Sequence, residues 1–418
     1  MGRIGRRGLV AGAVGTLASL MAPGPAAAGA GAVSRRYTPE EFRGMWVATV
    51  ANRDWPSASG LTPAEQRAEL LAHLDTAVRR RLNAVILQVR PTADALWASP
   101  YEPWSQWLTG VPGGDPGWDP LGTAVAEAHR RGLELHAWFN PYRVALHTDP
   151  ARLAPNHPVR DHPEWVVAYG GRLYYDPGLP EVRAFVQEAM LDAVQRYDVD
   201  AVHFDDYFYP YPVAGQVFAD DAAYAEYGTG FPDRAAWRRD NVDRLVREMS
   251  VRIRRLNKAS GRRVRFGISP FGIWRNATTD PLGSDTRGLQ AYDDLHADTR
   301  RWVKEGWIDH VVPQLYWHIG FAAADYARLL PWWSDAVRDT GVQLYVGEAL
   351  YKAGDPAQPA AWQDPAELSR HLSLARDHHP EVRGHVFFAA KEVMTDRIGA
   401  MARVVADHYP TPARPPDV

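Results

Sequence analysis

The sequence has no cysteine among its 418 residues. A chain without thiols forms no disulfide bond, no thiolate metal site and no cysteine nucleophile. The formal net charge is −3, so basic residues are not in excess. Proteins that bind polyanions usually carry a basic excess. The composition therefore excludes disulfide-stapled folds and predicts no nucleic-acid partner.

Long apolar runs are also scarce, and the one that exists lies within residues 1–32. This segment has a basic start, a small apolar stretch over about residues 8–21 and an Ala-rich end, which is typical of an export signal. The pair Arg6-Arg7 resembles a twin-arginine signal, but ordinary secretory signals also carry arginine pairs, so both export routes stay open. No second apolar span of about 18 residues follows. We expect a mature chain without a membrane span, secreted or associated with the cell wall.

Common catalytic and cofactor motifs are missing. No G-x-G-x-x-G follows the first predicted strand, no G-x-S-x-G follows any strand, and no H-x-H or H-E-x-x-H occurs. These absences argue against a dinucleotide site, a serine hydrolase and a zinc hydrolase. His136, His203, Asp205 and His318 could converge on a metal, but hydrogen-bonded histidines inside the fold are the favoured interpretation. We expect no metal and no cofactor.

Short runs rich in Val, Ile, Leu and aromatic residues alternate with amphipathic helical segments after the signal. Eight runs are predicted to be strands, at residues 44–50, 83–90, 133–140, 200–205, 264–270, 310–317, 343–350 and 384–390. The first helix has a capping box formed by Thr62 and Glu65. Eight strand–helix units predict an α/β fold, a (β/α)8 TIM barrel. We expect one domain over residues 42–409 with long strand-end loops, followed by a Pro-rich tail at residues 410–418.

The active site of such a barrel lies at the carboxyl ends of its strands. Polar or aromatic residues follow every predicted strand. The residues expected to bind substrate share this position: Arg53, Arg90, Asn140, Tyr142, Arg143, Tyr207, Trp274, Gln314, Tyr316, Trp317, His318 and Lys391. The long insertion after the second strand adds Trp97 and Trp104 as walls of a groove. Exposed rings stack on sugar faces, although core packing uses the same side chains.

Two adjacent aspartates end the fourth strand, in VDAVHFDDYFYPYP. Alternation of side chains places His203 and Asp205 on the barrel side and leaves Asp206 at the turn. Glu348 is the only acidic residue near the end of the seventh strand. Glycoside hydrolysis needs one carboxyl group to protonate the leaving oxygen and a second to act as nucleophile or base. We expect Asp205 and Glu348 to form this catalytic pair, with Asp206 assisting.

Each of these acidic residues also has a structural interpretation. Asp205 and Asp206 would then cap a helix or hold a loop at the end of the strand. Glu348 would form an ion pair with Lys352 or Arg90.

Seven segments carry a resemblance to a known family, namely EFRGMWVATVANRDWPS, LNAVILQVRPTADALW, ELHAWFNPYR, VDAVHFDDYFYP, ISPFGIWRN, VVPQLYW and GHVFFAA. Over about residues 42–400 the chain resembles the glycosyl hydrolase-like 10 family, exported or lipid-anchored bacterial TIM-barrel proteins. The resemblance implies hydrolysis of glycosidic bonds, with peptidoglycan strands stripped of their stem peptides as the substrate. Lipid-anchored members carry a cysteine after the signal, so its absence here implies a released or non-covalently held protein.

The spacing D-x-x-x-x-D from Asp200 to Asp205 is similar to the fourth strand of α-amylase-like and α-galactosidase-like barrels, and to that of chitinase-like barrels. In the first two groups the last aspartate is the nucleophile, while the second acid is placed differently from Glu348. We therefore expect an exported glycoside hydrolase with a polysaccharide substrate. A carbohydrate-binding barrel that has lost catalysis and keeps an aromatic groove is the alternative, because one fold hosts many functions.

Overall fold

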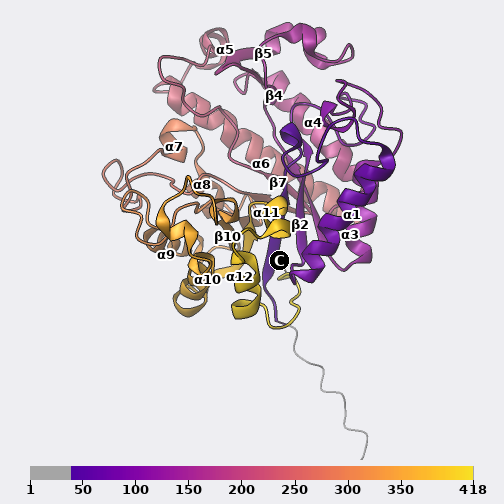
Figure 1. Ribbon diagram of the computed structural model, residues 1–418. Coiled ribbons are helices and arrows are strands. Elements are labelled where there is room, and N and C mark those ends of the chain that lie inside the picture. The colour runs from indigo at the N-terminus through magenta and orange to yellow at the C-terminus, as the bar shows by residue number, and fades with distance from the viewer. Residues whose placement is uncertain (1–38, 418) are drawn as a thin grey trace, which may run out of the picture. The chain divides into compact units, whose positions relative to one another are not determined.

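The computed structural model describes residues 39–417, so the predicted export signal at residues 1–32 lies outside the described part. Eight parallel strands close into a barrel in the order β1-β2-β3-β7-β8-β9-β10-β11, and β11 pairs with β1. Figure 1 shows strands β2, β7 and β10 in the middle of the ribbon, with helices such as α1, α3, α9 and α10 around them. The predicted (β/α)8 barrel is confirmed.

The barrel strands are β1 (Phe42–Val47), β2 (Ala84–Arg90), β3 (Glu134–Phe139), β7 (Ala201–Phe204), β8 (Arg265–Ile268), β9 (His310–Val311), β10 (Gln343–Glu348) and β11 (Val382–Phe387). The main helices are α1 (Pro63–Arg79), α3 (Pro120–Arg130), α4 (Pro180–Arg196), α6 (Arg234–Ser260), α8 (Thr299–Lys304), α9 (Tyr326–Val337), α10 (Glu367–His378) and α12 (Ala400–His408). Short helices are α2 (Gln106–Thr109), α5 (Asp221–Tyr227), α7 (Ala291–Asp294) and α11 (Ala390–Thr395).

Each of the eight predicted runs overlaps one barrel strand, and the capping box of Thr62 and Glu65 opens α1. The largest difference is at β9, which has two residues where eight are predicted. Pro313 follows this strand and has no N–H to donate to a sheet. The strand therefore ends early. Beyond it, the pairing with the neighbouring strands continues only as isolated bridges from Gln314 to Phe271 and to Gly347.

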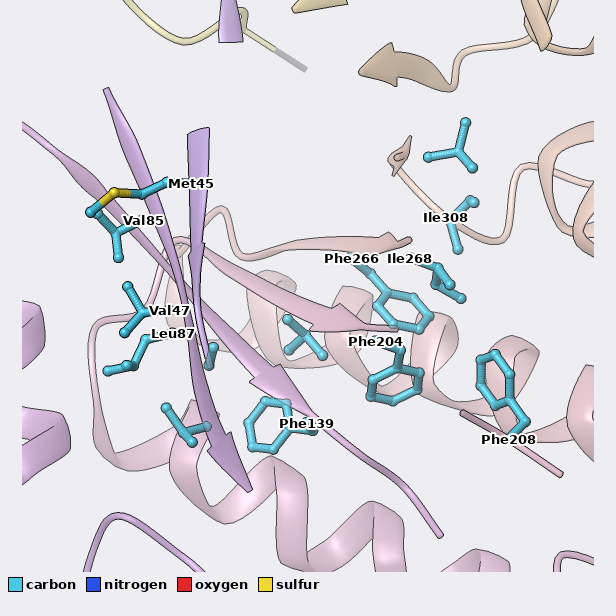
Figure 2. Packing of buried hydrophobic residues seen from close by; sticks show 14 of the residues in the cluster. Met45, Val47, Val85, Leu87, Phe139, Phe204, Phe208, Phe266, Ile268 and Ile308 are labelled. Atoms are coloured by element: carbon cyan, nitrogen blue, oxygen red, sulfur yellow. The ribbon is translucent and has the colours of Figure 1, made fainter. Parts of the chain in front are cut away.

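Side chains alternate between the barrel interior and the layer beneath the helices. The interior cluster contains Phe42, Trp46, Ala48, Ala84, Ile86, Trp138, Val312, Tyr345 and Val386. Figure 2 shows the outer layer, in which Met45 and Val47 of β1 lie beside Val85 and Leu87 of β2. The parity of a residue on its strand thus decides whether its side chain enters the barrel or packs under a helix.

An insertion between β3 and α4 forms a small antiparallel sheet of β4 (Arg143–Ala145), β6 (Arg172–Tyr175) and β5 (Val166–Tyr169), in that order. Strands β4 and β5 stand with α5 at the top of Figure 1. This sheet begins four residues after β3 ends, so it holds Arg143 next to the carboxyl ends of the barrel strands.

The Pro-rich tail packs beside the start of β1. The backbone N–H of Glu41 donates to the carbonyl of Arg414 over 3.0 Å, and the N–H of Arg414 donates to Pro39 over 3.0 Å. The Asn83 side chain donates to the carbonyl of Ala413 over 3.1 Å. The tail therefore covers the end of the barrel opposite the strand carboxyl ends. Among the helices of residues 39–417, none combines the length and apolarity needed to cross a membrane.

Candidate active site

A cavity of about 380 Å³ lies at the carboxyl ends of the barrel strands. Its lining consists of Trp46, Trp138, Asp205, Asp206, Tyr207, Tyr211, Ser269, Phe271, Gln314, Tyr316, Trp317, Tyr351, Lys352 and Phe388. These residues belong to or follow seven of the eight barrel strands. Nine of the fourteen are aromatic, so the walls suit flat apolar faces such as those of sugar rings, while few polar groups remain to carry chemistry.

Asp205 follows β7 directly and faces the cavity, the position that the sequence predicts for it. Its Oδ2 accepts hydrogen bonds from the indole Nε1 of Trp138, at 3.0 Å, and from the side-chain amide of Asn140, at 2.5 Å. Its Oδ1 accepts the backbone N–H of Tyr207 at 3.0 Å. Three donors therefore fix the orientation of a carboxyl group that is only 4% exposed.

Asp206 faces the same cavity. Its Oδ1 accepts a hydrogen bond from Nε2 of Gln314 at 3.0 Å, and its Oδ2 accepts a short one from the hydroxyl of Tyr211. Asp205 keeps the inward parity of His203, but strand β7 ends at Phe204, so the alternation that would turn Asp206 away from the cavity does not extend to that residue. The end of one strand thus presents two carboxyl groups to one cavity.

Burial favours the protonated form of both aspartates. Burial and the neighbouring charge of Asp206 raise the pKa of Asp205 to about 7, although Arg143 acts in the opposite direction. Burial also raises the pKa of Asp206, against the hydrogen bonds from Tyr211 and Gln314. Two carboxyl groups that interact strongly titrate as a pair, and ionisation of one disfavours ionisation of the other, so over part of the pH range the pair holds one proton and one negative charge. Such a pair can donate a proton and stabilise a developing positive charge.

Asn140 donates a hydrogen bond to Asp205, and Arg143 donates one to Asn140. Neither residue lines the cavity. The Asn140 side-chain oxygen accepts from Nε2 of Gln88 at 2.6 Å and from Nη2 of Arg143 at 3.0 Å, so its amide nitrogen is directed at Asp205. The Arg143 guanidinium also lies 5.2 Å from the ring centroid of Tyr207. The structure therefore assigns both residues to positioning the carboxylate rather than to the cavity wall.

The predicted facing pair of Asp205 and Glu348 is wrong. Tyr345 of β10 points into the barrel, whereas Leu344 and Val346 pack in the outer layer. Glu348 has the parity of the outer residues, so its side chain lies under the helices, where it is 0% exposed.

Glu348 is instead held by three neighbours in that layer. Its Oε1 accepts from the hydroxyl of Tyr326 at 2.9 Å and from Nδ1 of His385 at 3.0 Å, and its Oε2 accepts from Nδ1 of His371 at 2.8 Å. Burial would raise the pKa of Glu348, but the two histidines outweigh it and lower that pKa to about 2. The structural interpretation of Glu348 is therefore correct, although its partners are histidines rather than Lys352 or Arg90.

Four predicted binding residues do line the cavity beside the aspartates: Tyr207, Gln314, Tyr316 and Trp317. Three others are buried elsewhere. Arg90 is 0% exposed and donates from Nε to Glu102 at 2.6 Å, Tyr142 is 0% exposed in the hydrophobic core, and the indole of Trp97 donates to Asp192 at 2.7 Å. The predictions for these three are wrong because their side chains face the packed layer behind the cavity, where they hold loops together.

Two further tryptophans lie away from the cavity. The indole of Trp274 donates to Asp298 at 2.9 Å, and its ring stacks on Trp332 at 5.9 Å. Trp104 is half-buried in the loop after β2 and lines two other surface hollows with Pro103. The Trp274 ring anchors its loop, and the Trp104 ring packs against the edge of the hydrophobic core.

Three polar predictions also fall outside the lining. Arg53 forms ion pairs with Asp54 and with Glu392, at 3.1 Å for the latter, and its guanidinium lies over the ring of Phe388. His318 is hydrogen-bonded through Nδ1 to a neighbouring backbone carbonyl at 2.8 Å, and Lys391 is exposed on α11. Arg53 thus supports a cavity wall, and the other two lie beyond it.

Sequence reasoning leaves out eight lining residues: Trp46, Trp138, Tyr211, Ser269, Phe271, Tyr351, Lys352 and Phe388. Strand parity is the signal that identifies two of them, since Trp46 shares the inward face of Phe42, and Trp138 that of His136. Tyr351 and Lys352 follow β10 within four residues, so the strand-end rule already covers them.

The residues considered as metal ligands have other partners. His203 lies one layer below Asp205, with its Nε2 2.9 Å from the hydroxyl of Ser269 and 3.2 Å from the indole nitrogen of Trp46. Within residues 39–417 no group of three or more His, Asp or Glu side chains has the arrangement of a metal site.

Comparisons with known proteins agree with this architecture. The chain is 49% identical over 381 residues to glycosyl hydrolase YngK of Bacillus subtilis (strain 168), covering 90% of this chain and 74% of that protein. It is 40% identical over 369 residues to glycosyl hydrolase DigH of Escherichia coli (strain K12), covering 84% of this chain and 83% of that protein. The solved glycoside hydrolase domain of PgaB (BpsB) from Bordetella bronchiseptica has the same fold, with a TM-score of 0.55 at 14% identity, covering 89% of this chain and 100% of that chain. The model of the glycosyl hydrolase-like 10 family matches residues 41–364, and this chain belongs to that family.

Proposed function

We propose that this protein is an exported glycoside hydrolase that cleaves the glycan strands of the cell wall after their stem peptides have been removed. The observation that carries the proposal is the pair of Asp205 and Asp206, buried side by side at the wall of an aromatic cavity. Membership of a glycosyl hydrolase-like family supports the reaction class, and the resemblance supports the substrate. The signal pattern in residues 1–32 supports export.

The shared proton gives the two carboxyl groups different tasks. The protonated group donates to the glycosidic oxygen as the bond to the anomeric carbon breaks, and the ionised group stabilises the positive charge that develops on the sugar ring. Water then adds to the anomeric carbon and gives up a proton to the pair, which restores its starting protonation state. Both groups are less than 7% exposed, so water screens this interaction little. Hydrogen bonds from Asn140 to Asp205 and from Gln314 to Asp206 keep both carboxyl groups in place during the transfer.

The aromatic walls position the sugar. Trp46 and Trp138 lie at the inner end of the cavity, and both of their indole nitrogens are already hydrogen-bonded, to His203 and Asp205 respectively. Only their apolar faces remain for a ligand. Flat apolar faces of this kind stack on the C–H faces of pyranose rings, which brings the glycosidic oxygen to the aspartates.

The proposal is tested by sugar release. Purified mature protein is incubated with peptide-free cell-wall glycan strands and, separately, with strands that keep their stem peptides. New reducing ends and shortened strands, seen by mass spectrometry, are expected from the peptide-free material. Binding without release supports the alternative, a carbohydrate-binding barrel, and release from both materials alike contradicts the proposed substrate.

A further inference from the structure

Lys352 is the one cation in the lining of the cavity. It ends the 3-10 turn Leu350–Lys352 that directly follows β10. In the barrel order, β8 and β9 lie between this strand and β7, which carries the two aspartates. The ammonium group and the acidic pair therefore lie on different walls of one cavity.

The Lys352 ammonium has no anionic partner among residues 39–417. Its Nζ donates to the backbone carbonyl of Tyr316 at 2.6 Å, and it lies 5.8 Å from the ring centroid of Tyr351 and 5.7 Å from that of Trp362. In the part of the chain that is described, no carboxylate comes within 4 Å of it. The ammonium group has three N–H donors, and one of them is used in the hydrogen bond to Tyr316. The others remain for a ligand. Burial lowers the pKa of Lys352, the expected effect of an ammonium that has lost water without gaining an anion.

The neighbouring cations are already paired. Arg53 forms ion pairs with Asp54 and Glu392, and Arg143 is hydrogen-bonded to Asn140 and to the backbone of Pro91. Neither of them lines the cavity. A negatively charged group of the substrate that reaches the β10 wall therefore meets Lys352.

We propose that Lys352 binds a carboxylate carried by the sugar next to the scissile bond, and that this contact selects glycan strands whose stem peptides have been removed. The inference rests on the proposed function. A muramyl residue with a stem peptide has its lactyl group locked in an amide, which is neutral. Removing the peptide frees the lactyl carboxylate, so each peptide-free disaccharide gains one negative charge at a substituent of the ring. The Lys352 ammonium lies beside aromatic residues of the cavity lining on which a sugar ring can stack. Its positive charge and its long, flexible side chain suit it to bind the lactyl carboxylate of that sugar.

Uronic acids also carry a sugar carboxylate, so the test compares three glycans: peptide-free strands, the same strands with the lactyl carboxylates converted to methyl amides, and an oligouronate. Affinity is measured by titration calorimetry, and kcat/KM by release of reducing ends. The variants are Lys352→Met, Lys352→Arg, and Lys258→Met as the matched control. Lys258 is an exposed lysine in the last turn of α6 and is not among the residues that line the cavity.

We expect the unsubstituted enzyme and K258M to bind peptide-free strands about tenfold or more tightly than amidated strands, the effect of one charge-assisted hydrogen bond. In K352M this ratio falls to about one, and K352R restores part of it because the positive charge is kept. Equal affinity of the unsubstituted enzyme for charged and amidated strands overturns the inference, as does a ratio that survives in K352M. Preference for the oligouronate overturns the assignment to the lactyl group.

Binding and release separate this inference from the proposed function. Charge-selective binding without release supports the Lys352 site and contradicts hydrolysis. Release of reducing ends without charge selection supports hydrolysis and contradicts the Lys352 site. Absence of both binding and release contradicts both.

Discussion

The side-chain amide of Asn140 donates to Oδ2 of Asp205 over 2.5 Å, which joins the end of β3 to the end of β7 at the wall of the cavity. The same amide is oriented by Gln88 and Arg143 through its oxygen. A polar network that starts at the end of β3 thus fixes the orientation of the Asp205 carboxyl group, which belongs to the proposed catalytic pair.

Removing this contact should move the pH dependence of the enzyme. The hydrogen bond from Asn140 lowers the pKa of Asp205, against burial and the charge of Asp206, which raise it. Asn140→Ala should therefore raise that pKa, and the basic limb of the kcat/KM profile should shift to higher pH. A pH–rate profile checks this. A loss of activity that is uniform at all pH values would show that Asn140 has only a structural role.

The unsubstituted enzyme should give a bell-shaped profile of kcat/KM. Activity requires one proton on the pair, so it rises as the first carboxyl group ionises and falls as the second does. The pKa of Asp205 is raised to about 7, which places the basic limb near neutral pH. Rates measured from pH 4 to pH 9 check this. Activity that stays constant up to pH 9 would contradict a shared catalytic proton.

Glu348→Gln should affect stability rather than catalysis. The substitution breaks a fully buried ion pair with His371, a change that typically costs about 3–5 kcal/mol. The folded-state pKa of Glu348 is lowered to about 2, so its contribution is present above the unfolded pKa and is lost as pH falls through about 2. Thermal unfolding at several pH values should therefore show a large difference at pH 6 that narrows in acid. A folded variant that has lost turnover would restore the catalytic assignment of Glu348.

Replacing Trp317 with alanine should mainly weaken glycan binding, whereas replacing Trp97 with alanine should mainly lower the free energy of unfolding. Trp317 is half-buried in the cavity lining, so its replacement should weaken glycan affinity by about tenfold with little change in melting temperature. Trp97 is 0% exposed and bonded to Asp192, so its replacement should cost about 3–5 kcal/mol of unfolding free energy. Calorimetry for binding and for unfolding measures both effects. Normal binding by W317A would remove that ring from the proposed site.

The barrel could be predicted from the sequence because its signals are local. Each predicted run overlaps a strand, and the capping box at Thr62 marks the start of α1. The position of Asp205 followed from side-chain alternation along β7, which is also local. The short β9 is explained by Pro313.

The predictions that were wrong concern residues whose contacts in the folded protein cannot be read from the sequence. Glu348 and Arg90 both lie at strand ends. Glu348 is held by histidines from α10 and β11, whereas Arg90 is held by Glu102. Each partner is at least twelve residues away along the chain, so no spacing rule connects them. Charged residues buried with such partners resemble catalytic residues in sequence, and only the tertiary packing separates the two classes.

Turnover of peptide-free glycan by Asp205→Asn and Asp206→Asn tests the central claim most directly. Both substitutions keep the size of the side chain while removing a titratable carboxyl group, so both proteins should melt close to the unsubstituted enzyme. Because both groups line the cavity and the proposed reaction needs a proton on one and a negative charge on the other, each variant should lose about 100-fold or more in kcat while still binding glycan. Two folded variants that both release reducing ends at the unsubstituted rate would contradict catalysis by this pair.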